Sequence, residues 1–361
     1  MKHYDVAVIG AGVFGAWTAW HLQRAGKSVL LVDAWGAGHT RSSSGDESRI
    51  IRMGYGADAI YTRMAMRSLT LWREHFPQFV FPTGVLWIAR QNNPYSAATE
   101  RTLAECGVPL EILSPDELSR RFPQMHLKDA YAILEPESGA LLARRAVAAV
   151  VENANVDFRV EMVRPPAAGL ADVLIFACGA WLPRLFPALL ESRIFPTRQE
   201  VFYFAPPAGD QRFAPPQFPA WVDFSDPRSS YGIPDLDHRG FKIAFDRHGP
   251  AFDPDLGDRR IGDAALEDMR GFLAERFPDL RDAPLAEFRV CQYENTSNGD
   301  FLIDRHPDWP HIWLVGGGSG HGFKHGPAVG EYVASQILGT RAPEPRFSLA
   351  SKGEVQQRTV Y

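Results

Sequence analysis

The chain has 361 residues, of which 45% are hydrophobic and 22% are charged, proportions typical of an ordinary globular protein. This composition excludes a mainly disordered chain, and the length predicts two or three domains. The 38 basic and 43 acidic residues give a net charge of −5 and form no basic stripe. We therefore expect neither a nucleic-acid nor a membrane partner.

Three scattered cysteines, Cys106, Cys178 and Cys291, lack the spacing of a disulfide framework or a zinc site. The N-terminus shows no secretory signal pattern, and the longest apolar runs are far shorter than a membrane span. These features predict a cytoplasmic protein in a reducing compartment. They do not distinguish a monomer from a small homo-oligomer.

The N-terminus is predicted to fold as a βαβ unit. A strand is expected at 4–9, a glycine-rich turn at 10–15, a helix at 13–25 and a second strand at 28–32. The next segment, 34–56, is polar and rich in glycine, which predicts a loop with little regular structure. Loops of this length inside a compact domain are usually functional.

The rest of the chain continues with both helical and strand patterns. Helices are expected at 57–76, after the capping residue Ser114, at 140–152, at 263–277 and at 326–338, and strands at 79–90, 173–178, within 196–243 and at 311–315. Strand–glycine–helix units thus occur at both ends of the chain, with strand-rich segments between them. This order predicts one domain that is assembled from distant segments.

We therefore predict an α/β protein in which two domains interleave. A Rossmann-like dinucleotide-binding domain is expected from 1–75, 140–195 and 290–361. A substrate domain of the α+β type, built on an antiparallel sheet, is expected from 76–139 and 196–289.

The glycine-rich turn carries the first chemical signal, because Gly10, Gly12 and Gly15 fit the G-x-G-x-x-G pattern between a strand and a helix. Such glycines permit a tight turn, a close approach of the backbone to a pyrophosphate, and close helix–strand packing. Asp33 ends the second strand, where an acid can bind ribose hydroxyls. The pattern predicts adenine-dinucleotide binding, without separating NAD from FAD; a glycine turn without a ligand is the alternative.

Several further segments resemble one family of flavoenzymes. They are Ser42-Ser43-Ser44-Gly45-Asp46-Glu47-Ser48-Arg49-Ile50-Ile51-Arg52, Glu135-Pro136-Glu137-Ser138-Gly139, Gly179-Ala180-Trp181, Pro196-Thr197-Arg198-Gln199, Phe301-Leu302-Ile303-Asp304 and Gly316-Gly317-Gly318-Ser319-Gly320-His321-Gly322-Phe323-Lys324. In this order they resemble the D-amino-acid-oxidase superfamily, most closely its monomeric sarcosine oxidase and N-methyltryptophan oxidase branch. The resemblance spans nearly the whole chain and implies FAD as the cofactor, with Ser43, Gly318, Gly320 and Gly322 added to its site.

The resemblance also implies catalytic roles for residues of these segments. Arg49 matches an arginine beneath the flavin, Lys242 a lysine that assists oxygen reduction, and His321 a histidine near the flavin. A cation beside reduced flavin stabilises the negative charge that develops on oxygen. A solvated strand lysine is the alternative for Lys242. His321 and His325 have i, i+4 spacing, but they stand in a glycine-rich loop without an evident third ligand, so we expect no metal site.

Arg52 and Lys324 match the two cations that bind the substrate carboxylate in the family. Arginine offers a planar fork to a carboxylate, and lysine adds a point charge. The alternative for Arg52 is a surface ion pair. The resemblance places Tyr55 and Tyr293 in the same substrate-binding site.

Two substrate-site positions depart from the family. Asp246 stands where the family has a histidine, and Glu294 where it usually has a threonine. Both changes add negative charge if they face the pocket. We therefore expect a substrate with an additional cationic group, or a bulkier amine than sarcosine.

Cys291 stands where a cysteine of this branch forms a thioether with the flavin, so the resemblance implies a covalent cofactor bond here. A thiolate that attacks the flavin ring needs positive surroundings or another means of lowering its pKa. A buried structural cysteine is the alternative. Cys106 and Cys178 have no such match and are expected to be packing residues.

Taken together, these features predict an FAD-dependent enzyme that oxidises the C–N bond of a secondary amine or N-alkyl amino acid. The imine then hydrolyses, and O₂ is reduced to H₂O₂. One alternative is an FAD-dependent dehydrogenase that passes electrons to a quinone or a carrier protein. Another is a non-catalytic flavin-binding electron-transfer module. An NAD dehydrogenase is least favoured, because nothing in its pattern requires segment 316–324.

Overall fold

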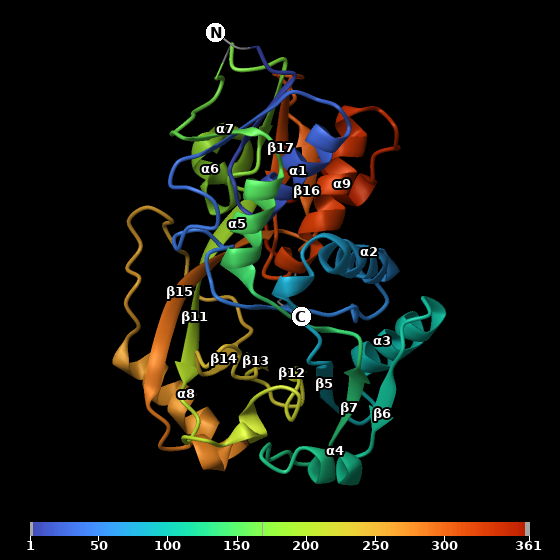
Figure 1. Ribbon diagram of the computed structural model, residues 1–361, viewed down its shortest axis with the longest axis vertical. Coiled ribbons are helices and arrows are strands. Elements are labelled where there is room, and N and C mark those ends of the chain that lie inside the picture. Colours follow the sequence, from blue (N-terminus) through green and yellow to red (C-terminus); the bar gives the residue numbers. More distant parts are fainter. Residues whose placement is uncertain (1–2, 168, 358–361) are drawn as a thin grey trace.

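A computed structural model describes residues 3–167 and 169–357 of the chain. The outer limits of the predicted domains, residues 1 and 361, lie outside these residues. Within the described residues the strands form a six-stranded sheet, an eight-stranded sheet and a small three-stranded sheet (Figure 1). Parallel and antiparallel strands are both present, which confirms the predicted mixed α/β fold.

The six-stranded sheet has the order β16-β17-β10-β1-β2-β9 among the described strands. Its members are β1 (Val6–Ile9), β2 (Val29–Asp33), β9 (Asp157–Val160), β10 (Val173–Phe176), β16 (Leu302–Arg305) and β17 (Ile312–Gly316). All pairs are parallel except β16 with β17. The inner strands β1, β2 and β17 are buried on both faces, as a parallel sheet requires, and are apolar apart from Asp33 at the end of β2.

Helices cover both faces of this sheet. On one face pack α1 (Val13–Arg24), α2 (Ala59–His75), α5 (Ala143–Asn153) and α9 (Gly326–Ile337). The short helices α6 (Leu182–Leu185) and α7 (Pro187–Leu190) contribute Leu182, Phe186 and Leu190 to the core on the other face. Segments from the two ends of the chain therefore share one layered core, and Figure 1 shows α1 beside α9.

The eight-stranded sheet has the order β15-β11-β14-β13-β12-β5-β7-β6 among the described strands. Its members are β5 (Val85–Arg90), β6 (Glu111–Leu113), β7 (Ala130–Glu135), β11 (Ile194–Phe204), β12 (Ala220–Asp223), β13 (Ser230–Ile233), β14 (Phe241–Phe245) and β15 (Leu285–Thr296). Only β12 and β5 pair in parallel among these neighbours. The helices nearby are α3 (Pro94–Glu105), α4 (Pro115–Arg121) and α8 (Asp263–Arg276).

The long strands β11 and β15 pair along their length and run from the eight-stranded sheet up to the six-stranded one (Figure 1). Residues of these two strands, among them Tyr293 and Glu294, therefore reach a cavity at the edge of the six-stranded sheet. The predicted domain boundaries at 75, 139, 195 and 289 remain a prediction.

One sequence-based prediction is corrected by the small sheet, which contains β3 (Arg49–Ile51), β4 (Val80–Phe81) and β8 (Gly139–Leu141). Segment 34–56, all of which the structure describes, has little regular structure, as predicted, and the three-residue strand β3 is its one strand or helix. The helix expected from residue 140 begins at Ala143, because the preceding residues pair with β3 and β4. A Cβ at Gly139 would lie 2.0 Å from the carbonyl oxygen of Phe81, so this close pairing requires glycine.

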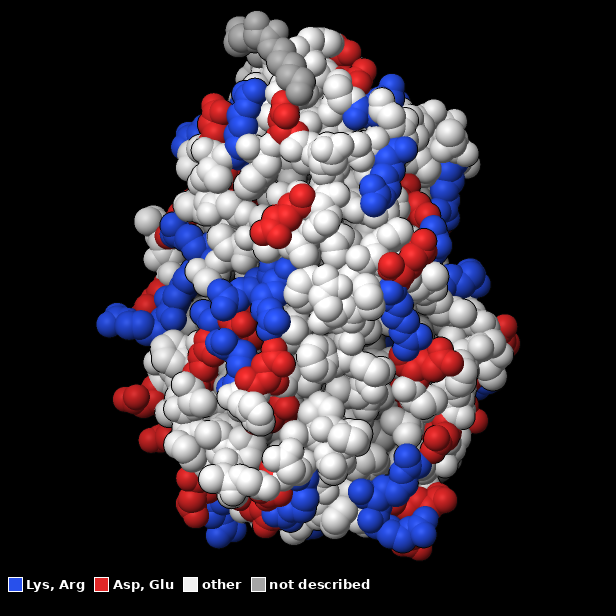
Figure 2. All heavy atoms as spheres, viewed as in Figure 1, with Lys and Arg blue, Asp and Glu red and all other residues white. Residues whose placement is uncertain are grey.

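Most other predicted elements agree with the structure to within a few residues. Ser114 caps α4 in the predicted manner, since the Glu117 amide donates to its hydroxyl at 3.3 Å. None of the described helices is both long enough and apolar enough to cross a membrane. On the face shown in Figure 2, basic and acidic side chains are interspersed.

Candidate active site

A cavity of about 1130 Å³ lies at the carboxyl ends of β1, β2, β10 and β17. Ligands of α/β proteins bind at this edge of the sheet. The lining comes from distant parts of the chain, including Gly10, Gly12, Asp33, Ser43, Arg49, Cys178, Tyr293, Glu294, Gly318, Gly320, Gly322 and Phe323. The structure therefore brings together most of the predicted cofactor-binding residues. It also places Cys178, which was expected to be a packing residue, at the wall.

The first glycine turn has the geometry of a dinucleotide cradle. A Cβ at Gly15 would lie 1.8 Å from the Gly10 carbonyl oxygen, and one at Gly10, whose φ is +105°, would lie 2.4 Å from that of Ala177. A Cβ at Gly12 would meet only the Ser44 hydroxyl, at 3.5 Å. Gly10 and Gly15 are thus required by the backbone itself, whereas Gly12 leaves open space toward the cavity.

Asp33 fixes this turn from the end of β2. Its carboxylate accepts hydrogen bonds from the amides of Ala11 at 2.7 Å, Trp35 at 2.8 Å and Gly36 at 3.0 Å. The Nε2 atom of His39 lies 3.7 Å away. Asp33 also borders the cavity, where the family pattern expects an acid to meet the ribose.

Glu294 lies against the second glycine turn. Its Oε1 accepts a hydrogen bond of 3.0 Å from the Gly318 amide, and its buried Oε2 has no partner among the described residues. Burial raises the pKa of this carboxyl to about 7, although backbone hydrogen bonds oppose the change. A buried acceptor at the cavity wall fits a bound molecule that carries hydroxyl groups, as FAD does. The cradle and this acceptor together fit FAD.

Lys242 and Cys291 lie close to Arg49, which lines the cavity. Lys242 is only 1% exposed, so it is not a solvated strand lysine. Its Nζ lies 2.7 Å from Oδ2 of Asp46, which Arg49 also contacts. The Cys291 sulfur is 3.9 Å from a guanidinium nitrogen of Arg49. Burial and Asp46 raise the pKa of the Cys291 thiol, whereas Arg49 and Lys242 lower it.

Sequence reasoning did not assign Asp46 a role. It lies three residues before Arg49 in the same segment, and cations held away from solvent, such as Arg49 and Lys242, require a counter-ion. That requirement is a signal that could have drawn attention to it. Ser43, by contrast, was predicted to bind the cofactor, and it lines the cavity. Its hydroxyl donates a hydrogen bond of 2.9 Å to the Gln292 carbonyl, which joins the loop to β15.

Arg52 is buried to 4% exposure, which excludes a surface ion pair. Its guanidinium carbon lies 4.8 Å from the ring centre of Tyr55 and 4.4 Å from that of Trp87. Glu135, which sequence reasoning quoted but did not assign, holds this loop: it accepts from the Met53 amide at 2.7 Å and the Trp87 indole at 2.9 Å. Arg52 is thus oriented by packing on both sides.

Lys324 lies in the same region. Its Nζ donates to the Tyr55 hydroxyl at 2.7 Å and to the His321 carbonyl at 2.9 Å. Burial, together with Arg52, holds the pKa of Lys324 well below its ordinary value. His321 and His325 both approach the Tyr55 hydroxyl, with ring nitrogens at 3.3 and 2.7 Å. Among the described residues, no group of three potential metal ligands is found.

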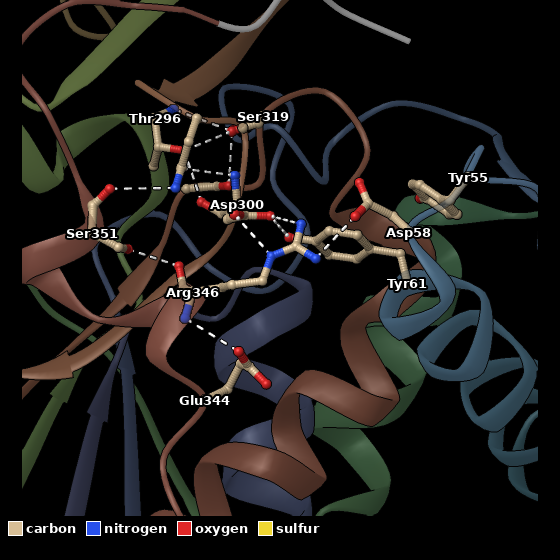
Figure 3. A network of polar contacts seen from close by, with 12 residues as sticks. Tyr55, Asp58, Tyr61, Thr296, Asp300, Ser319, Glu344, Arg346 and Ser351 are labelled. Carbon is tan, nitrogen blue, oxygen red and sulfur yellow. Dashed lines mark hydrogen bonds and ion pairs between the residues drawn. The ribbon is translucent and has the colours of Figure 1, made fainter. Parts of the chain in front are cut away.

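A polar network that includes Tyr61 lies next to Tyr55 (Figure 3). Tyr61, whose ring centre is 5.2 Å from that of Tyr55, donates its hydroxyl to Asp300 at 2.8 Å. The Arg346 guanidinium donates hydrogen bonds to Asp300 at 2.8 Å and to Asp58 at 2.9 Å, and so links the two carboxylates. The C-terminal segment therefore fixes the start of α2 next to the Tyr55 loop.

The two departures from the family pattern are separated by the fold. Asp246 follows β14 and accepts a hydrogen bond of 3.1 Å from the Tyr293 hydroxyl. Burial raises its pKa to about 6, and the charges of Arg52 and Lys324 oppose that change. Asp246 therefore belongs to the group around Arg52, whereas Glu294, on the opposite face of β15 from Tyr293, lies at the glycine turn.

Fold and site together define a dinucleotide-binding enzyme that has two buried cations, Arg52 and Lys324, in addition to the cofactor cavity. The chain matches the FAD dependent oxidoreductase family over residues 5–336, and it belongs to that family. It is accordingly an FAD-dependent oxidoreductase.

Relatives match the chain over nearly its full length. It is 31% identical to the monomeric sarcosine oxidase of Bacillus sp. (strain B-0618), over 99% of each chain. The peroxisomal sarcosine oxidase of Homo sapiens is 30% identical over 91% of each chain. The N-methyl-L-tryptophan oxidase of Salmonella heidelberg is 29% identical over 96% of this chain and 97% of its own.

Solved structures share the fold. The fructosyl peptide oxidase of E. terrenum superposes with a TM-score of 0.81 and 20% identity, over 96% of this chain and 92% of its own. The L-proline dehydrogenase of P. horikoshii superposes with a TM-score of 0.82 and 19% identity, over 96% of this chain and 97% of its own. Both an oxidase and a dehydrogenase thus have this fold, so the fold alone does not specify the electron acceptor.

Proposed function

We propose that this enzyme oxidises the C–N bond of an N-alkyl amino acid and uses O₂ as the electron acceptor. The observation that carries the proposal is the group formed by the buried cations Arg52 and Lys324 and the half-buried Asp246, which accepts a hydrogen bond from Tyr293 at the wall of the cavity. Two cations and one carboxylate complement an amino acid, which carries a carboxylate and an amine. The sarcosine oxidase and N-methyltryptophan oxidase relatives support this substrate class.

In the proposed reaction the amine loses two electrons and becomes an imine, which water hydrolyses to an aldehyde and the dealkylated amine. Bound FAD, held by the two glycine turns and Asp33, would supply the redox chemistry that couples the two-electron oxidation of the amine to the reduction of O₂, with two protons, to H₂O₂. The remaining steps fall to side chains of this chain: they bind, orient and hold charge.

Arg52 and Lys324 bind the substrate carboxylate. Packing between Tyr55 and Trp87 orients the guanidinium fork, which suits a planar carboxylate. Lys324 adds a charge whose position is fixed by hydrogen bonds to Tyr55 and to the His321 carbonyl. This fixed geometry holds the amine end of the substrate toward the cavity.

Lys242 and Arg49 act on the oxygen half-reaction. Arg49 lines the cavity, and Lys242 is held close to it by Asp46, which contacts both side chains, and by the Ser48 carbonyl at 2.6 Å. A preorganised cation in a buried site stabilises the negative charge that oxygen acquires on reduction.

Asp246 selects the amine. Its carboxylate is positioned by Tyr293 and stands near the two carboxylate-binding cations, so it attracts a cationic group of the substrate. We therefore expect that an N-methyl amino acid with a second amino group in its side chain is oxidised more efficiently than sarcosine. The prediction fails if cationic N-alkyl amino acids give a kcat/KM no higher than that of sarcosine.

The decisive experiment is an anaerobic screen in which N-methyl, cyclic and primary amino acids are mixed with the holoenzyme and bleaching of the flavin is recorded. Matched O₂ consumption and H₂O₂ release after readmission of air supports the oxidase. Bleaching without rapid reoxidation by O₂ indicates instead a dehydrogenase that uses a quinone or carrier. A flavin that no amine bleaches contradicts the proposed function.

A further inference from the structure

Asp46 is the anion on which Lys242 and Arg49 converge. Its carboxylate is fully buried, with Oδ2 at 2.7 Å from the Lys242 Nζ and in contact with Arg49. The other oxygen accepts hydrogen bonds from the Tyr203 hydroxyl at 2.7 Å and from the Glu47 amide at 2.8 Å. Both oxygens are therefore used, and the position of the carboxylate is tightly defined.

These contacts join two parts of the fold. Asp46 lies in the loop whose residues Ser43 and Arg49 line the cavity, whereas Lys242 comes from β14 and Tyr203 from β11 of the eight-stranded sheet. The Ser48 carbonyl of the same loop is the other partner of the Lys242 Nζ. The position of the ammonium relative to the cavity is thus determined by the loop around Asp46.

The charges explain why the anion matters. Burial raises the pKa of Asp46, but Lys242 and Arg49 outweigh it and hold that pKa far below its ordinary value. Burial lowers the pKa of Lys242, and Asp46 is the principal group that opposes this change. Without the carboxylate, two buried cations would face each other, and the lysine is the one that can lose its proton.

We propose that Asp46 is a positioning residue that keeps Lys242 in place and protonated, and so sets the pH range in which the reduced enzyme reacts rapidly with O₂. This inference rests on the proposed role of Lys242 in the oxygen reaction. The other groups that face this ammonium are Arg49, the Cys291 thiol on β15 and Tyr203, whose ring centre lies 5.7 Å from the Lys242 Nζ. Asp46 is the anion of this set near neutral pH, because burial raises the pKa values of the Cys291 thiol and of the Tyr203 phenol.

The test uses the holoenzyme and its Asp46→Asn variant. Each is reduced anaerobically by substrate, mixed with O₂ in a stopped-flow instrument, and followed from pH 6 to pH 9. For the wild type we expect a nearly constant reoxidation rate, because Lys242 stays protonated. For Asp46→Asn we expect a rate within about 3-fold of the wild type at pH 6 and a loss of ~10-fold or more at pH 9, as the lysine loses its proton.

A second readout does not depend on turnover. The midpoint potential of the bound flavin is measured at pH 6 and pH 9. Asp46→Asn adds a net positive charge at pH 6, which raises the potential relative to wild type, and the difference disappears at pH 9 when Lys242 is neutral. A merely structural role would change the potential similarly at both pH values.

Glu47→Gln is the matched control, because Glu47 is the adjacent buried carboxylate but pairs with Arg144 and Arg289, each at 2.9 Å. It should leave the pH dependence of reoxidation unchanged. Should Asp46→Asn fail to fold, Asp46→Glu is used instead, because it keeps the negative charge but displaces it. We then expect the reoxidation rate to fall at alkaline pH, by less than the loss expected for Asp46→Asn. Lys242→Arg in the Asp46→Asn background, which cannot lose its proton, should restore a flat profile.

Two results would overturn the inference. If Asp46→Asn, or Asp46→Glu in its place, keeps the wild-type pH profile while Lys242→Met slows reoxidation, the lysine acts as proposed but Asp46 does not control it. If Lys242→Met leaves reoxidation unchanged, the proposed role of Lys242 fails and the inference fails with it. The two failures are therefore distinguished by the lysine variant alone.

Discussion

The hydroxyl of Tyr55 accepts a hydrogen bond of 2.7 Å from the Nζ of Lys324, and the two residues are 269 positions apart in the chain. The same hydroxyl lies 2.7 Å from Nε2 of His325. Because burial and Arg52 already disfavour the charge of Lys324, this acceptor helps to keep the ammonium protonated.

Tyr55→Phe should therefore impair substrate binding, most strongly at alkaline pH. Loss of an acceptor lowers the pKa of Lys324 further, so the cation is lost at a lower pH. We expect the KM for the amino acid to rise ~10-fold, with the alkaline limb of kcat/KM moved to lower pH. Tyr61→Phe is the control, since its hydroxyl binds Asp300 instead. Identical pH profiles for Tyr55→Phe and the wild type would contradict this role.

Two glycines of the first turn should respond differently to alanine. A Cβ at Gly15 meets the Gly10 carbonyl at 1.8 Å, so Gly15→Ala should destabilise the apoprotein by several kcal/mol. A Cβ at Gly12 has space in the protein but faces the cavity, so Gly12→Ala should change stability by less than about 1 kcal/mol while weakening FAD binding ~10-fold or more.

Urea unfolding of the apoprotein and fluorescence titration with FAD measure the two effects. A Cys291→Ser background keeps cofactor binding reversible. Equal losses of stability in the two alanine variants would show that Gly12, too, is required by the backbone.

Cys291 is predicted to hold FAD covalently. The adjacent Arg49 favours the thiolate, which opposes the effect of burial on the thiol pKa. Acid precipitation of the holoenzyme should then give a yellow pellet, and mass spectrometry should show the protein mass increased by that of FAD less two hydrogen atoms, which are lost when the S–C bond forms and the flavin is reoxidised. Cys291→Ala should release all flavin, whereas Cys178→Ala should retain it, although Cys178 also borders the cavity. A colourless wild-type pellet would refute the bond.

Glu294 should make the apoprotein less stable as the pH rises. Burial raises its folded-state pKa to about 7 from an ordinary value of 4.5, so the folded state holds the proton more tightly than the unfolded chain. Its contribution to stability is therefore greatest below pH 4.5 and is lost between pH 4.5 and about pH 7. Glu294→Gln should remove this loss and raise the free energy of unfolding at pH 8 by on the order of 3 kcal/mol.

Urea unfolding of the apoprotein at pH 5 and pH 8 tests this dependence, with the exposed Glu105→Gln as control. The difference between Glu294→Gln and the wild type should grow with pH. A difference that is constant across this range would mean that Glu294 is not responsible.

Local patterns in the sequence were sufficient for much of the fold. The glycine turn, the capping residue Ser114 and the apolar strands near both ends each depend on a few neighbouring residues, whose conformational preferences act at short range. The sequence pattern failed at 140–141, where residues expected to begin a helix belong to β8, because pairing with β3 and β4 outweighs local propensity.

The site was predictable in its residue types and only partly in its arrangement. The family motifs name Arg49, Arg52 and Lys324, but they do not indicate that Asp46 meets Lys242, 196 residues away. Nor do they indicate that Asp246 joins the cationic group while Glu294 turns to the glycine loop.

The sequence by itself determined the dinucleotide turn, the alternation of strands and helices, and the family of flavoenzymes to which the motifs point. Only the tertiary structure decided which buried charges face one another. The reason is physical: a helix cap or a glycine turn is stabilised by neighbours in the chain, whereas the energy of a buried charge depends on whichever distant groups the fold brings within a few ångströms.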